Sequence, residues 1–170
     1  MKLLIASDLH GSAYYVKKLI DVYKNSGAEK LVLLGDLLYH GPRNDLPEEY
    51  SPKTVISLLN ELRDEIICVR GNCDTEVDQM VLDFPILSDY AWIFDGDIKM
   101  FLTHGHVYNK ENLPKLSHGD VLLNGHFHIT EDIEINGIRY INPGSVSIPK
   151  EDTKHSCILY NSGIFEFVEL

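Results

Sequence analysis

Two histidines in the segment GHFH, His126 and His128, are separated by one phenylalanine and directly follow an apolar run. In an extended chain, residues two apart point to the same face, about 6–7 Å from each other. That separation is wide for one metal ion but suits two ions about 3.5–4 Å apart, with one imidazole on each. Taken alone, the pattern fits equally well two histidines that are satisfied by hydrogen bonds at a strand end.

Four other apolar segments end in polar clusters of the same kind. In chain order they are SDLHG with Asp8 and His10, GD with Asp36, GNCD with Asn72 and Asp74, and THGH with His104 and His106. Each could be an ordinary turn, because Asp, Asn and Gly are common in turns. Ligands of α/β proteins gather beyond the carboxyl ends of the strands. Five such clusters, with five of the eight histidines, therefore indicate one shared site.

The apolar segments in the first half have the pattern of a parallel α/β sheet. Short apolar runs at 2–7, 30–35 and 65–71 predict buried strands. Helical spacing over 12–26 and 53–64 predicts the helices that connect them. This β-α-β-α-β order implies a parallel sheet.

The second half of the chain changes character. Asp-Gly and Asn-Gly turns predict hairpins within residues 90–105 and 132–142, and an Asn-Ser-Gly turn predicts a third within 157–170. A further buried strand is expected at 120–125. Parallel units followed by hairpins suggest two sheets packed face to face with helices outside, in one domain of residues 1–170.

Composition limits the classes of function. The chain is 44% hydrophobic and 24% charged, as in soluble globular proteins, and no apolar run approaches the length that spans a membrane. A net charge of −11 without a basic stripe disfavours binding to a nucleic-acid polymer. The cysteines Cys68, Cys73 and Cys157 form no C-x-x-C pair, which predicts a reducing compartment, so a cytoplasmic protein is expected.

The order of the motifs resembles the calcineurin-like metallophosphoesterase superfamily. D-x-H, G-D, G-N-x-D, G-H and G-H-x-H follow one another over nearly the whole chain, and the short length and INPGSVS (141–147) resemble its small bacterial branch, the YfcE-type phosphodiesterases. The resemblance implies an α/β fold, a four-layer α/β/β/α sandwich of two packed mixed sheets with flanking helices. It also implies two metal ions and hydrolysis of phosphoric esters.

The resemblance assigns seven metal ligands to positions of this sequence. The first ion would be bound by Asp8, His10 and His128, the second by Asn72, His104 and His126, and Asp36 would bridge the two. Carboxylate, imidazole and amide ligands suit Mn²⁺, Fe²⁺, Zn²⁺, Mg²⁺ or Ni²⁺, and the lack of thiolates disfavours a structural zinc. Mn²⁺ is the favoured ion.

Such a site implies a metal-dependent phosphoric diester hydrolase. Two divalent cations with Asp8 and Asp36 give a cationic site that attracts a phosphoryl oxyanion. A hydroxide that bridges the ions would attack phosphorus in line with the leaving alcohol. The expected substrate is a small phosphodiester. The alternatives are a phosphomonoesterase, a hydrolase of nucleotides or dinucleoside polyphosphates, and a non-catalytic scaffold that resembles a retromer subunit.

The predicted catalytic residues are Asp74, Cys73 and His104. Much of the superfamily has histidine in place of Cys73, where it is thought to protonate the leaving group or hold phosphate. A thiol with a pKa of about 8.5 is a poorer acid at pH 7, so esters whose leaving groups need little protonation should be favoured. The alternatives are that Cys73 is a nucleophile or a small buried filler. Asp74 is expected to orient a metal-binding histidine.

Substrate contacts are expected from Asn72, Cys73, His106 and Arg43. His106 follows a ligand by two residues, so it faces the same pocket or makes a simple hydrogen bond. Arg43 lies on the loop after Asp36 and could reach a phosphate, although a plain surface position is the better interpretation. The hairpin edges near 90–103 offer a surface for a homo-oligomer, a dimer or tetramer.

Overall fold

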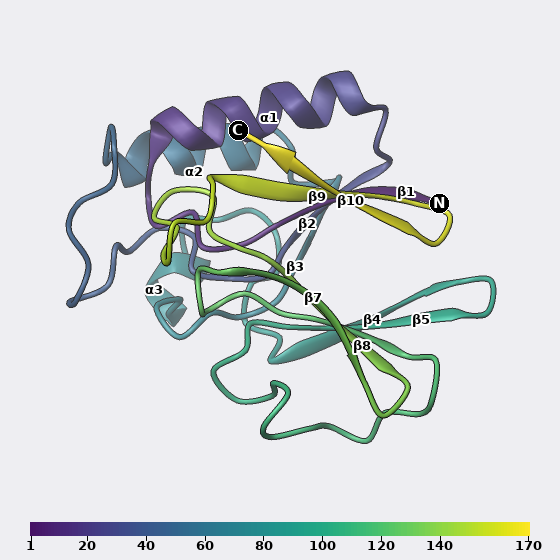
Figure 1. The fold of residues 1–170 in the computed structure, drawn as a ribbon. Coiled ribbons are helices and arrows are strands. Elements are labelled where there is room, and N and C mark those ends of the chain that lie inside the picture. Colours follow the sequence, from purple (N-terminus) through teal and green to yellow (C-terminus); the bar gives the residue numbers. More distant parts are fainter.

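The computed structural model describes residues 1–170 and contains two five-stranded sheets that pack face to face (Figure 1). The strands of the first sheet are β1 (Lys2–Ala6), β2 (Lys30–Leu33), β3 (Ile66–Cys68), β9 (Ser156–Asn161) and β10 (Ile164–Glu169). The strands of the second sheet are β4 (Tyr90–Asp95), β5 (Ile98–Thr103), β6 (Val121–Leu123), β7 (Thr130–Ile135) and β8 (Ile138–Pro143). Their spatial orders are β10-β9-β1-β2-β3 and β4-β5-β6-β8-β7.

Both sheets are mixed. The parallel pairing of β1 with β2 and of β2 with β3 confirms the prediction for the first half of the chain. The last hairpin, β9 and β10, returns to this sheet and pairs antiparallel with β1. In the second sheet β5, β6 and β8 are parallel, and the hairpin partners β4 and β7 form its edges. The α/β fold of two packed mixed sheets is confirmed.

Two helices cover the outer face of the first sheet (Figure 1). In α1 (Ala13–Ser26), the Ser12 side chain accepts a hydrogen bond from the Tyr15 N–H, and Gly27 ends the helix with a φ of 71°. Helix α2 (Pro52–Asn60) is shorter than predicted, because residues 61–65 continue as turns. A third helix, α3 (Glu76–Gln79), is a single turn that the sequence did not predict.

The space between the sheets is filled by a cluster of thirteen buried side chains. Leu3, Ile5 and Val32 contribute from the first sheet, and Leu102, Leu123 and Ile141 contribute from the second. Burying one such side chain stabilises the fold by about 1.5–3 kcal/mol. The rigid sandwich that results holds the strand ends at fixed positions.

The outer face of the second sheet is covered by a loop and not by helices. Phe101 and Tyr140 belong to a small buried cluster on this face, and Tyr108 and Leu116 of the segment after β5 pack against it. The predicted flanking helices are therefore found on the first sheet alone. None of the three helices is long and apolar enough to cross a membrane.

Candidate metal centre

Side chains from five separate strand ends meet at one edge of the sandwich. Asp8, which follows β1, places Oδ1 3.2 Å from Nε2 of His128, which follows β6. Asp36, which follows β2, places Oδ2 3.4 Å from Nε2 of His104, which follows β5. The same His104 nitrogen lies 3.0 Å from Oδ1 of Asn72, which follows β3. The structure thus brings together residues that are up to 120 positions apart, because the sheets align their carboxyl ends.

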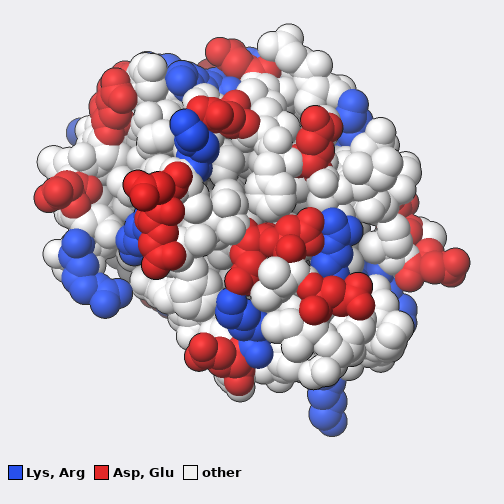
Figure 2. Space-filling model, viewed as in Figure 1, with Lys and Arg blue, Asp and Glu red and all other residues white.

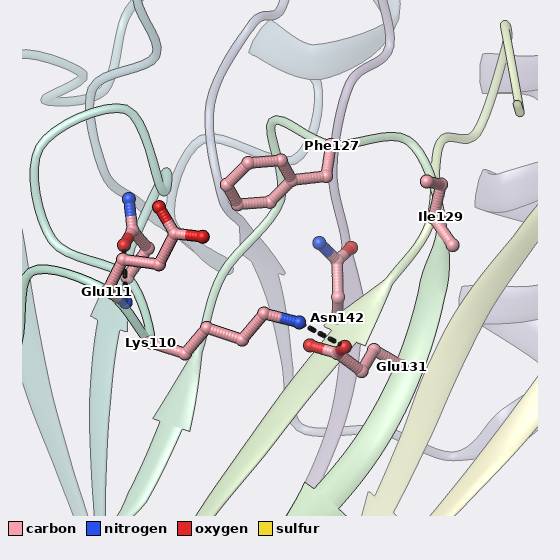
Figure 3. Close-up of a pocket in the computed structure, with 7 residues that line it drawn as sticks. Lys110, Glu111, Phe127, Ile129, Glu131 and Asn142 are labelled. Atoms are coloured by element: carbon pink, nitrogen blue, oxygen red, sulfur yellow. Dashed lines mark hydrogen bonds and ion pairs between the residues drawn. The ribbon is translucent and has the colours of Figure 1, made fainter.

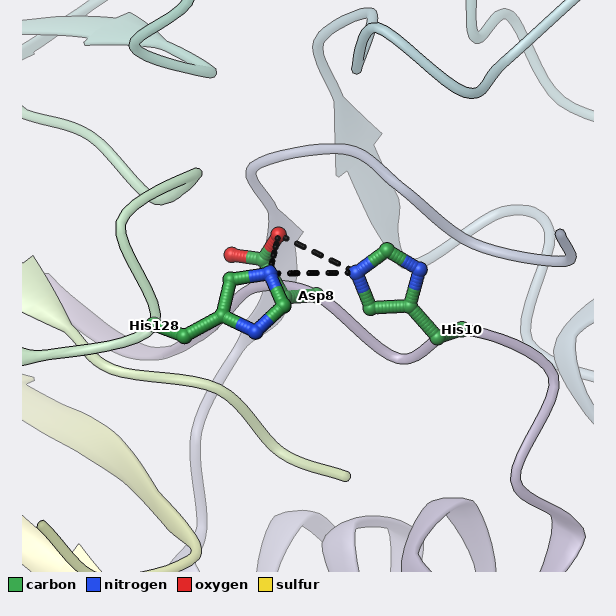
Figure 4. A group of neighbouring side chains, drawn as sticks. All are labelled: Asp8, His10 and His128. Atoms are coloured by element: carbon green, nitrogen blue, oxygen red, sulfur yellow. Dashed lines mark hydrogen bonds and ion pairs between the residues drawn. The ribbon is translucent and has the colours of Figure 1, made fainter. Parts of the chain in front are cut away.

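The first group of side chains consists of Asp8, His10 and His128 (Figure 4). The Nε2 atoms of the two histidines are 3.3 Å apart, and Asp8 Oδ1 is 3.5 Å from Nε2 of His10. All three residues are buried. Their ligand atoms therefore point toward a common centre that is shielded from bulk water.

Main-chain carbonyls fix which nitrogen of each imidazole carries the proton. Nδ1 of His10 donates to the Tyr39 carbonyl, and Nδ1 of His128 donates to the Ile148 carbonyl, each at 2.7 Å. A carbonyl oxygen can only accept, so in the neutral ring the proton is on Nδ1 and Nε2 keeps its lone pair. Both lone pairs then face each other and the carboxylate of Asp8.

This arrangement fits a cation. Asp8 Oδ1 is buried and accepts no hydrogen bond, although its partner oxygen Oδ2 accepts one from the His126 N–H at 2.9 Å. A buried carboxylate oxygen without a partner costs free energy, as does a pair of opposed lone pairs. One divalent ion among Asp8, His10 and His128 would satisfy all three atoms, and nitrogen and oxygen ligands suit such an ion.

The second group of side chains surrounds Asp36. Its Oδ2 lies 3.4 Å from Nε2 of His104 and 3.7 Å from Nε2 of His10, so it sits between the two groups. His104 Nδ1 donates to the Leu34 carbonyl at 2.7 Å, which again leaves Nε2 as an acceptor in the neutral ring. The ring of His126 lies beside that of His104, with centroids 5.1 Å apart.

The electrostatic field at this edge favours positive charge. Burial by itself would lower the pKa of His104, but Asp36 and Asp8 outweigh burial and raise the pKa to about 9. The pKa of Asp8 stays well below its ordinary value, because the imidazoles of His10 and His128 overcome the opposing effect of burial. The two carboxylates that raise the pKa of His104 would equally attract a metal cation.

Five of the seven predicted ligands have a left-handed backbone. The φ angles are 58° at Asp8, 45° at His10, 56° at Asp36, 69° at His126 and 61° at His128. The expectation that the GHFH histidines lie on an extended strand is therefore wrong, since β6 already ends at Leu123. Non-glycine residues in this region cost about 1–2 kcal/mol each, and such strain collects at functional sites.

Neighbouring residues hold these strained turns in place. The hydroxyls of Ser145 and Ser147 donate to the Asp8 carbonyl at 2.8 and 3.1 Å. Gly71 and Gly125 have no side chain because a Cβ would overlap Oδ1 of Asp36 and the Ser7 hydroxyl, respectively. The backbone can thus approach both carboxylates closely.

Asp74 supports the site in a different way from the one predicted. We expected it to orient a metal-binding histidine, but its carboxylate accepts backbone N–H groups of Asp36, Leu37 and Gly71 at 2.7–2.9 Å. It is buried, and burial raises its pKa. Asp74 therefore positions the turn that presents Asp36, and no hydrogen bond joins it to a histidine.

A cavity of about 280 Å³ opens over the two groups. Of the residues predicted to contact substrate, Arg43, Asn72 and Cys73 line it, and Lys150 lines it as well. His106 is not among the lining residues; its ring lies 5.4 Å from that of His104 and is exposed. Burial, and then the charge of Asp36, raise the pKa of the Cys73 thiol well above its ordinary value.

Several residues that build the site could not be identified from the sequence. Lys150 is one charged residue among many, and the carbonyls of Leu34, Tyr39 and Ile148 belong to no particular residue type. Ser147 lies in the INPGSVS segment that contributed to the resemblance, so that motif could have indicated it. Its role depends on contact with Asp8, which is 139 residues away.

Comparison with known proteins gives consistent matches. Residues 1–162 match the calcineurin-like phosphoesterase superfamily domain. The chain is 45% identical to the phosphodiesterase YfcE of Escherichia coli strain K12 over 170 residues, which is 100% of this chain and 92% of that protein. It is 27% identical to the phosphodiesterase MJ0936 of Methanocaldococcus jannaschii over 85% of this chain and 83% of that one.

Solved structures agree with this. The structure of YfcE, a phosphoesterase from E. coli, superposes with a TM-score of 0.93 at 47% identity and covers 95% of this chain and 88% of that one. Vps29 from Entamoeba histolytica superposes with a TM-score of 0.65 at 22% identity over 100% of this chain and 99% of that chain, a likeness of fold alone. This chain belongs to the calcineurin-like phosphoesterase superfamily.

Proposed function

We propose that this chain is a dinuclear-metal-dependent phosphodiesterase that hydrolyses small phosphodiesters. The observation that carries the proposal is the buried convergence of carboxylate oxygens and imidazole Nε2 atoms around Asp8 and Asp36. Asp8 Oδ1 is buried and accepts no hydrogen bond, so a cation beside it would satisfy it. The similarity to the E. coli phosphodiesterase over the whole chain supports the diester as the substrate class.

Seven side chains would hold the two ions. Asp8, His10 and His128 would bind one ion, Asn72, His104 and His126 would bind the other, and Asp36 would be shared by the two. The distances of Asp36 Oδ2 to Nε2 of His10 and of His104 support this role for Asp36. When bound, two divalent cations activate water as a nucleophile and stabilise the charge that builds on the phosphoryl oxygens. The chain contributes the fixed geometry, through the carbonyls and serine hydroxyls described above.

Two basic side chains of the cavity would orient the substrate. Arg43 and Lys150 line it from different segments, and neither makes a salt bridge within the chain. Lys150 is placed by its own N–H, which donates to the His128 carbonyl at 2.9 Å. Figure 2 shows that acidic and uncharged groups separate the basic side chains on the face that it displays. Attraction of an anionic ester would thus depend on local cations at this cavity.

Cys73 would limit the choice of leaving group. A thiol with an ordinary pKa of about 8.5 is a poorer acid near neutral pH than an imidazolium, so Cys73 would give a departing alkoxide little help. Hydrolysis would then favour esters of acidic alcohols such as phenols, whose leaving groups need little protonation.

Metal identity, location and assembly are part of the same proposal. The nitrogen and oxygen ligands without thiolate suit Mn²⁺, which we propose as the working ion. The free cysteines Cys68, Cys73 and Cys157 support a cytoplasmic location. The edge strand β4 exposes two aromatic side chains, Tyr90 and Phe94, which supports a homo-oligomer. Each chain would form a single domain of residues 1–170.

The test combines metal content with turnover. Metal-stripped protein is loaded with Mn²⁺, Mg²⁺ or Zn²⁺ and offered a bis-aryl phosphate and the matching aryl phosphate monoester. We expect two ions per chain and turnover that prefers the diester. Preference for the monoester would favour a phosphomonoesterase, and two bound ions without turnover of either ester would favour a scaffold.

A further inference from the structure

A second cavity lies on the other side of the segment that carries the GHFH histidines. His126 and His128 line the metal-centre cavity, whereas Phe127 and Ile129 line this one, which encloses about 240 Å³ (Figure 3). One short segment thus forms the wall between the two cavities. A ligand that occupied both cavities would have to extend across this segment.

Phe127 is unusually exposed for a large apolar residue next to a buried polar centre. Its side chain is 43% exposed, and its ring meets the ring of His126 edge to face at 5.2 Å between centroids. Figure 3 shows the ring projecting toward the space above Lys110 and Asn142. An exposed aromatic face beside a reaction centre offers a stacking surface for a planar ligand.

The charges of this second cavity differ from those of the first. Lys110 is paired with Glu131, and Glu111 adds a further negative charge to the lining. No unpaired cation lines it, so a phosphate or carboxylate would be repelled. Asn142 is buried and already donates to the Gly125 carbonyl and accepts from the Gly144 N–H. The cavity therefore suits an uncharged ring more than an anion.

We propose that this cavity binds the aromatic group of a phosphodiester, such as an aryl ring or a nucleobase, by stacking it on Phe127. This inference rests on the proposed function, because it places the scissile phosphate at the metal centre and one ester arm beside Phe127. The volume is below the roughly 300 Å³ at which pockets for drug-sized ligands begin, so it fits one ring system. Phe127 is then the residue that selects esters with an aromatic arm.

The test uses two diesters that share one leaving group. Methyl 4-nitrophenyl phosphate and phenyl 4-nitrophenyl phosphate release the same phenolate and differ in the arm that remains. In the Mn²⁺-loaded enzyme we expect kcat/KM to be about tenfold higher for the phenyl ester, mainly through a lower KM. This factor is expected because stacking of a base on an aromatic side chain contributes about 1–3 kcal/mol. Phe127→Ala should bring the ratio close to one, and Phe127→Tyr should restore it.

A binding measurement separates this inference from the proposed function. Phenyl phosphate should bind the wild-type protein more tightly than methyl phosphate, by about tenfold in calorimetry, and Phe127→Ala should remove the difference. Phe167→Ala, which removes an exposed phenylalanine from β10, is the control and should keep the difference. Turnover without any dependence on the arm, in wild type or variants, would overturn the inference and leave the proposed function standing. Binding that depends on the arm, without turnover of either ester, would overturn the proposed function and keep the binding site for an aromatic group.

Discussion

The two cavities on either side of the 125–131 segment are built by opposite means. In the first, buried Asp and His side chains are held by main-chain carbonyls and buried hydroxyls, with little freedom to move. In the second, an exposed phenylalanine and a surface ion pair line an open space. Metal binding requires fixed ligand distances, whereas stacking tolerates small shifts. We therefore expect substitutions to be far more costly on the first side than on the second.

The largest effect is expected from Asp36, because its carboxylate lies between both groups of ligands. Asp36→Asn removes the negative charge and should lower kcat/KM by more than a hundredfold, since partners outside the ligand set already cost about 10–100-fold. The number of Mn²⁺ ions bound per chain should also fall. Asp64→Asn, at an exposed carboxylate, is the matched control and should match wild type in both measurements. An Asp36→Asn protein that stays active and still binds two ions would show that the first cavity does not depend on this carboxylate.

A gain of activity is expected on the first side from Cys73→His. A histidine acid contributes about 10²–10⁴-fold where the leaving group needs a proton. Phosphodiesters with alkyl leaving groups should therefore gain at least tenfold in kcat, whereas 4-nitrophenyl esters should change little. Rates for a series of esters, plotted against the pKa of the leaving alcohol, measure this. An unchanged slope would show that Cys73 only fills space.

A substitution of Asp74 tests whether the turn that presents Asp36 must be held in place for metal binding. Asp74→Asn turns one accepting oxygen into an N–H donor. In either orientation of the amide this donor faces a backbone N–H group, that of Leu37 or those of Asp36 and Gly71. We expect Mn²⁺ affinity to fall about 10–100-fold and the free energy of unfolding to fall by about 1–3 kcal/mol. Urea unfolding and metal titration measure the two effects. Asp83→Asn on the surface is the control, and equal behaviour of the two variants would contradict this role.

The smallest effect is expected from Lys150, at the exposed rim of the first cavity. Lys150→Gln should raise KM several-fold for any diester and leave kcat nearly unchanged, because exposed ion pairs are worth about 0.2–1 kcal/mol. The increase should shrink as salt is added to the assay. Unlike Phe127→Ala, Lys150→Gln should not change the preference between aryl and methyl arms. A change in that preference would show that the two cavities do not act separately.

The strands, the hairpins and the polar residues that follow each strand could be predicted from the sequence alone. Local patterns suffice for these, since apolar runs and Asn-Gly turns act over a few residues, as at β7 and β8 around Asn136 and Gly137. The convergence of the five clusters was predicted from the general rule that ligands of α/β proteins gather beyond the carboxyl ends of the strands. The family resemblance added the division of the ligands between two ions.

The contacts that hold the site, and the second cavity beside it, could not be predicted before the fold was known. The left-handed turns at Asp8 and His128, the three N–H groups on Asp74 and the approach of Lys150 all depend on contacts between distant segments. The second cavity and the exposure of Phe127 arise in the same way. Local sequence cannot encode them, because side-chain direction at a turn is set by packing across the sandwich and not by the period of the strand.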